Sequence, residues 1–255
     1  MTALVEQVRV LRALVVRDLM MRYGREAGGF LWAILEPMIL CVGVTVVWSL
    51  MKPAYEHGIL LAAMVLTGYM NLTLWRHLTG SAVHLLRRNN LLFFHRGVST
   101  LDLFWSRQVL EFTATSAAFL VVYLAMLSLK LVEPIYDWSL CALAWISMAF
   151  LACAASLIFT IATESYEWAE KLVQPFQYLL IPISGTFFML EWLPSEARAF
   201  FWWNPLIHIN EMMRAGFVGS SVTTFWDWWY PWVFGTVVFA VGGFGVARAR
   251  RNVYV

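Results

Sequence analysis

Charged residues are scarce in this sequence. Asp, Glu, Lys and Arg make up 13% of its 255 residues, whereas 61% are hydrophobic. A soluble globular domain carries about 25% charged residues and about 45–50% apolar ones. The shortage of charge therefore argues against a soluble domain and indicates a polytopic membrane protein.

Motifs for ATP hydrolysis, metal binding and covalent catalysis are also missing. No GxxxxGK[ST] phosphate loop occurs, and the lysines (Lys52, Lys130 and Lys171) stand in no glycine-rich turn. The 5 histidines are scattered without the accompanying ligands that a zinc site needs. No nucleophile lies beside a candidate base. We expect no catalytic residue, no metal site, no cofactor bound by the chain and no ATPase activity of its own.

Cysteine is rare as well, with 3 residues, all inside apolar stretches: Cys41, Cys141 and Cys153. Thiols in such positions behave as small packing residues, so we predict no disulfide. The first residues lack the basic tip, unbroken apolar core and small-residue cleavage site of a signal peptide. The first apolar stretch is expected to act as its own insertion signal.

Long apolar runs dominate the rest of the chain. An apolar helix of about 20 residues spans a bilayer. Six spans are predicted near residues 28–50, 59–82, 105–130, 139–163, 172–190 and 230–247. Arginines concentrate in the links on one side, which places both termini in the cytoplasm. The predicted fold is one all-α transmembrane domain over residues 1–255, divided into a cytoplasmic interface helix (1–27), spans one to five (28–190), outer re-entrant helices (191–229), span six (230–247) and a cytoplasmic tail (248–255).

Two cytoplasmic segments are predicted to lie at the membrane surface. In residues 4–22, apolar residues recur at helical spacing, which indicates an amphipathic helix: Leu4, Val8, Leu11, Val15 and Leu19. Residues 83–97 place the apolar cluster 91–94 beside basic residues. Either segment can rest on anionic lipid or contact a cytoplasmic partner. The link 164–171 is acidic and is interpreted as a solvated face or a partner contact.

Glu36 and Arg76 are charged residues inside the first two predicted spans. Glu36 precedes Pro37 in the first span, and Arg76 lies at a similar depth in the second. A charge inside the bilayer is costly unless it is paired or hydrated. Three arrangements fit: a Glu36–Arg76 pair, a water-filled cavity that both line, or two side chains that reach the inner surface separately.

The outer region 191–229 is too apolar for a free loop and too interrupted by proline for one span. Two short helices are predicted, near 195–203 and 205–217, that dip into the outer leaflet. Pro205 suits a helix start and Gly216 a helix end. Eight of the 14 tryptophans lie on or near the outer side, as an aromatic belt or as a platform for sugar rings.

Three sequence runs resemble known proteins. RDLMMRYG at 17–24, followed by GFLWAILEP at 29–37, resembles the entry of membrane subunits of type-2 ABC exporters. PISGTFFMLEWLP at 182–194 and WNPLIHINEMMRAGF at 203–217 look like the signature of the capsular polysaccharide branch. The similarity covers essentially the whole chain.

The resemblance implies a homodimer in the bacterial inner membrane, with two separate ATPase subunits that bind ATP and Mg. It also implies a periplasmic co-polymerase, an outer-membrane channel and a lipid-linked polysaccharide as substrate. Residues 83–97 would be a coupling helix and residues 4–22 the interface helix. The implied ATPase-docking residues are Arg9, Arg12, Arg17, Arg87, Arg88, Leu91, Phe93 and Phe94. The implied re-entrant motif consists of Pro205, His208, Glu211 and Arg214.

A canal for the sugar chain follows as a hypothesis from this resemblance. Its candidate lining residues are Glu36, Arg76, Tyr178, Phe187, Phe188, Trp192, Trp202 and Trp203. Aromatic walls that bind sugar weakly suit processive passage, since every intermediate must also leave. Export of O-antigen or another lipid-linked polysaccharide is the alternative. A secondary transporter or a membrane-embedded enzyme is disfavoured because no internal repeat and no catalytic cluster is visible.

Overall fold

The computed structural model describes residues 2–23, 28–51, 55–56, 58–83, 85 and 99–253. These residues form α1 (Thr2–Tyr23), α2 (Gly28–Met51), α3 (Leu61–Ser81), α4 (Thr100–Ser128), α5 (Trp138–Ser165), α6 (Glu167–Ile183), α7 (Ser195–Phe201), α8 (Pro205–Val218) and α9 (Trp229–Val253). Two 3-10 turns cover Leu190–Trp192 and Gly219–Ser221. Strands β1 (Tyr55–Glu56) and β2 (Ile59–Leu60) form a small antiparallel hairpin, with Tyr55 opposite Leu60. The fold is mostly helical, as predicted.

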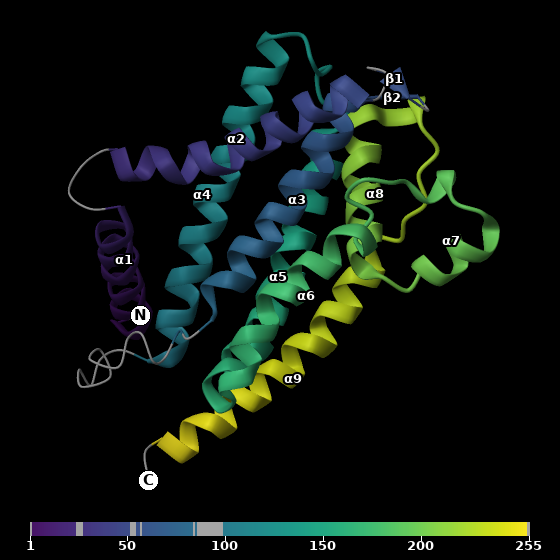
Figure 1. The fold of residues 1–255 in the computed structure, drawn as a ribbon. Coiled ribbons are helices and arrows are strands. Elements are labelled where there is room, and N and C mark those ends of the chain that lie inside the picture. The colour runs from purple at the N-terminus through teal and green to yellow at the C-terminus, as the bar shows by residue number, and fades with distance from the viewer. Residues whose placement is uncertain are drawn as a thin grey trace.

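The long helices form a bundle around α3 and α5 (Figure 1). α3 packs on α2, α4, α5 and α8, while α9 lies along α5. The start of α1 and the end of α9 both lie in the lower half of Figure 1, toward the ends of α3 and α5. α7 and α8 occupy the other end of the bundle together with the hairpin.

The core follows α3, whose side chains are buried over most of its length. Met64, Leu66 and Leu74 of α3 meet Met148 of α5 and Ile209 of α8 in one apolar cluster. Burying side chains of this size stabilises a fold by about 1.5–3 kcal/mol each in water. In a bilayer close packing takes over that role, because the lipid tails are equally apolar.

Local sequence sets the helix ends. Ser99 and Asp102 form a reciprocal capping box at the start of α4. Asp137 caps α5 by accepting hydrogen bonds from the backbone N–H groups of Ser139 and Leu140, at 2.8 and 3.1 Å. Asn204 caps α8, and Pro205 takes the first helical position.

Three helices of the described residues are long and apolar enough to cross a membrane, namely Thr100–Ser128, Trp138–Ser165 and Trp229–Val246, and Met38–Met51 is a shorter apolar stretch. The remaining spans stay predictions. α3 is interrupted by polar side chains such as Asn71, Arg76 and His77, and α6 has 17 residues with two internal prolines. The two short helices predicted for the outer region are confirmed as helices at Ser195–Phe201 and Pro205–Val218.

The fifth predicted span is placed differently by the structure. The prediction gave 172–190, but α6 covers Glu167–Ile183, so most of the acidic link 164–171 is helical. Tyr166 alone, in extended conformation, separates α5 from α6. The helix stops early because Gly185 adopts a positive φ of 75°, a conformation that favours glycine.

The amphipathic helix predicted near the N-terminus is confirmed as the helix α1. Val8 of its predicted apolar face is 63% exposed, a position open to lipid. Leu14 and Asp18 are buried, at 5% and 1% exposed. Asp18 faces α4, where its carboxylate contacts Arg107, a contact that apolar periodicity cannot reveal.

Candidate functional site

A fully buried arginine organises the end of the bundle that holds α7 and α8. Arg214 of α8 donates hydrogen bonds to the carbonyl oxygens of Gly185, Thr186 and Phe188, at 2.7, 2.7 and 2.8 Å. Its Nη1 atom lies 3.8 Å from Oε1 of Glu211, one helical turn earlier. The guanidinium thereby holds the loop that follows α6 in a single shape, because each carbonyl is bonded to the same rigid fork of donors.

Glu211 and His208 hold two further backbone segments. The Glu211 carboxylate accepts hydrogen bonds from the N–H groups of Leu190 and Phe225, at 3.0 and 3.1 Å. His208 Nδ1 accepts from the N–H of Asp227 at 3.0 Å, so its Nε2–H donates to the Trp202 carbonyl at 2.7 Å. The re-entrant motif that the resemblance implied is thus a buried network that fixes the loops on both sides of α8.

Asparagine side chains extend this network to α3. Asn210 donates to the Ser184 carbonyl at 2.8 Å and accepts from Asn71 of α3 at 3.0 Å. Gly68, one turn earlier on α3, lies where an added Cβ would be 2.1 Å from the Thr186 oxygen. The loop 184–190 therefore touches the backbone of α3 directly.

The predicted canal aromatics fall into two groups. Phe187 packs against Trp48 of α2 with 4.8 Å between ring centroids, and Phe188 packs against Phe201 of α7 at 5.3 Å. Both belong to the loop that Arg214 holds. Trp192 is half-buried against the core, and Trp202 packs edge-on to His208. Trp203 is 74% exposed. The canal itself stays a prediction.

Arg76 lies beside another candidate canal residue. Its guanidinium is 5.5 Å from the ring centroid of Tyr178, which is 57% exposed on α6. This distance is within cation–π range. The side chain of Glu36 lies outside the described residues, so its predicted pairing with Arg76 stays a prediction.

Sequence reasoning missed a polar cluster next to Arg76. His77 Nδ1 lies 3.0 Å from the Thr115 hydroxyl and 3.9 Å from Oε2 of Glu111, both on α4. Glu111 is 3% exposed. The position of Glu111 could have predicted this cluster, because an acidic residue inside a predicted span needs a partner.

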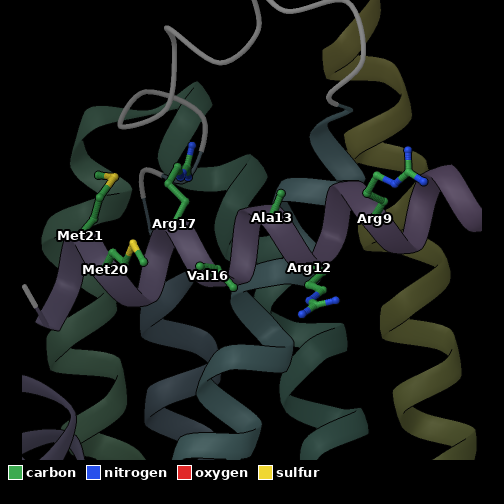
Figure 2. Close-up of a pocket in the computed structure, with 7 residues that line it drawn as sticks. All are labelled: Arg9, Arg12, Ala13, Val16, Arg17, Met20 and Met21. Carbon is green, nitrogen blue, oxygen red and sulfur yellow. The ribbon is translucent and has the colours of Figure 1, made fainter. Parts of the chain in front are cut away.

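The open face of α1 forms a shallow hollow of about 730 Å³ (Figure 2). It combines exposed arginine and methionine side chains, with the lining residues Arg9, Arg12, Ala13, Val16, Arg17, Met20 and Met21. Arg17 also donates from Nε to Asp18 at 3.0 Å. The other predicted docking residues, Arg87, Arg88, Leu91, Phe93 and Phe94, lie outside the described residues.

Comparison with known proteins assigns this architecture. The family described as ABC-2 type transporter matches residues 9–218, from the open face of α1 to the end of α8. The chain belongs to this family. The ABC-2 assignment agrees with the bundle of apolar helices and with the entry motif at 17–37.

Several curated proteins resemble this ABC-2 chain over most of its length. A capsule polysaccharide export inner-membrane protein, CtrC of Neisseria meningitidis, is 31% identical over 251 residues, which is 98% of this chain and 95% of that protein. BexB of Haemophilus influenzae, with the same description, is 32% identical over 86% of this chain and 83% of its own length. The polysialic acid transport protein KpsM of Escherichia coli is 25% identical over 86% of both chains. This ABC-2 chain is therefore a multi-pass inner-membrane permease subunit of an ABC transporter.

Proposed function

We propose that this chain is the transmembrane subunit of an ATP-driven exporter that carries a lipid-linked capsular polysaccharide across the inner membrane. The observation that carries the proposal is the near full-length similarity to a capsule polysaccharide export protein. The sequence runs at 182–194 and 203–217 support it. Residues of both runs form the hydrogen bonds around Arg214, which fix the conformation of this part of the chain.

The energy for export comes from a separate ATPase in this proposal. The chain has no phosphate loop, so ATP and Mg would bind to that partner. Two copies of the chain and two ATPase subunits would form the exporter, with both termini in the cytoplasm. A periplasmic co-polymerase and an outer-membrane channel would receive the polymer. The ATPase would dock on α1 and on residues 83–97, while residues 191–229 would shape the exit as re-entrant helices.

The open face of α1 suits docking by its chemistry. Arg9 and Arg12 are exposed, and Met20 and Met21 are 60% and 69% exposed beside them. Exposed apolar side chains flanked by cations are a typical protein-interaction surface. The sulfur-containing side chains adapt their shape to a partner.

Association with an ATPase tests this proposal directly. Purified in mild detergent from its native host, the wild-type chain should bring a stoichiometric ATPase subunit with it. Reversing two charges in the variant Arg9→Glu/Arg12→Glu should lower the recovered ATPase, because the docking face then repels the acidic partner surface that we expect. An Arg248→Gln variant on the exposed end of α9 is the matched control. If the wild-type chain brings no ATPase, the proposal fails.

Arg76 provides the second test, since its guanidinium lies 5.5 Å from the ring centroid of the candidate canal residue Tyr178. Arg76→Ala should lower surface polysaccharide without changing the amount of assembled complex. A contact of about 1 kcal/mol with Tyr178 corresponds to roughly a fivefold effect. Arg76→Lys keeps the charge and should retain most of the export. Normal polysaccharide levels in Arg76→Ala cells would remove the residue from the canal.

A further inference from the structure

A buried ionic contact and a hydrogen bond join α1 to the first turns of α4. Asp18 of α1 is 1% exposed, and its Oδ2 lies 2.9 Å from Nε of Arg107 of α4. Toward the other end of α1, Gln7 donates from Nε2 to Asp102 of α4 at 3.4 Å. Leu14 is buried between these two contacts. α1 is thus fixed to α4 along much of its length.

The start of α4 is itself packed firmly into the protein. Leu103 and Phe104 are almost completely buried in a cluster with Leu85 and Leu157. Leu85 and Ser99 are the described residues that flank 86–98, the segment we expect to dock an ATPase. Ser99 belongs to the capping box that starts α4. Both described flanks of that segment therefore meet the first turns of α4.

The opposite face of α1 is the open surface of Figure 2. α1 consequently has one face fixed to α4 and another face exposed for a partner. Separating the fixed face requires pulling a buried carboxylate away from Arg107. Arg17 of the same helix would remain beside the carboxylate, but a buried carboxylate that loses one of its cations is destabilised.

We infer that Asp18 and Arg107 are positioning residues that make α1 and the start of α4 move as one body, so that a displacement of the docked ATPase is passed into the membrane through α4. This inference rests on the proposed function, because it needs an ATPase that docks on α1. Packed side chains, ion pairs and rigid helices can carry energetic coupling between distant sites. The Asp18–Arg107 contact provides such a connection between α1 and the start of α4.

Single and swapped variants test the inference in the complete complex. Asp18→Asn and Arg107→Gln should each lower the amount of polymer exported per ATP hydrolysed, measured in proteoliposomes with the co-purified ATPase. Coupling free energies of typical size predict a loss of about five- to tenfold. The swapped variant Asp18→Arg/Arg107→Asp should recover at least part of the ratio, since it restores opposite charges. Arg248→Gln, on α9, serves as the control.

The outcomes separate this inference from the proposed function. If the wild-type chain brings an ATPase but both single variants export at the wild-type ratio, the inference alone is overturned. A variant that lowers only the amount of folded complex, at an unchanged ratio, also overturns it, because the contact is then merely structural. If the wild-type chain brings no ATPase, both the proposed function and the inference fail.

Discussion

Replacing Arg214 with glutamine should destabilise the chain more than any change on its surface. The variant leaves three carbonyl oxygens with fewer donors and leaves Glu211 as a buried carboxylate without its cation. Breaking a buried pair from one side costs about 3–5 kcal/mol in soluble proteins. The expected result is a large drop in the thermal unfolding midpoint of the detergent-solubilised chain, followed by its tryptophan fluorescence.

A second substitution distinguishes the charge effect from a loss of packing. The double variant Glu211→Gln/Arg214→Gln removes both charges, so it should be more stable than Arg214→Gln alone. Arg248→Gln is exposed and should behave like the wild-type chain. An unfolding midpoint of Arg214→Gln equal to that of Arg248→Gln would show that the network does not stabilise the α7–α8 end of the bundle.

Positions of the outer helices could be predicted because their signals are local. Pro205 fixes a helix start through its own ring, and Asn204 caps that helix with its own side chain. The fifth span was misplaced for an equally local reason. Acidic residues at 164–171 were interpreted as a link, although Glu, Ala and Lys favour helices and only Tyr166 interrupts this one.

Partners across the bundle could not be predicted, since they depend on the tertiary fold. Arg214 lies 26–29 residues from the carbonyl groups that it binds, and Asn210 lies 139 residues from Asn71. Hydrophobic periodicity carries no information about such pairs. The contact between α1 and α4 could not be predicted for the same reason, because the partner of Asp18 is on α4. Motif resemblance located the residues 205–214 without indicating what they contact.

The loop 184–190 contacts the backbone of α3. We therefore expect the Arg214 network to affect transport as well as stability. Gly68 lets the Thr186 carbonyl approach the backbone of α3, and the same oxygen accepts a hydrogen bond from Arg214. Phe187 and Phe188 extend from this loop toward α2 and α7. We therefore expect a shift of α3 to move Phe187 and Phe188, which we propose as canal residues.

The variant Gly68→Ala should disrupt this contact with the smallest possible change. Its Cβ would lie 2.1 Å from the Thr186 oxygen and 3.1 Å from Nη2 of Arg214, so either α3 or the loop has to move. Overpacking of this kind costs about 1–3 kcal/mol. We expect a lower unfolding midpoint and a loss of export larger than that of Arg76→Ala.

Gly80 on the same helix is the matched control. Among the residues that the structure describes, no heavy atom lies within 4 Å of an added Cβ there, outside the local backbone of the helix. Gly80→Ala should therefore leave export unchanged and stabilise α3 by up to about 1 kcal/mol through helix propensity. The two variants add the same methyl group to one helix. If Gly68→Ala lowers the unfolding midpoint and Gly80→Ala raises it, the loss of stability in Gly68→Ala is due to the Thr186 contact. Shifts of equal sign and size would instead show that glycine at position 68 serves no close approach.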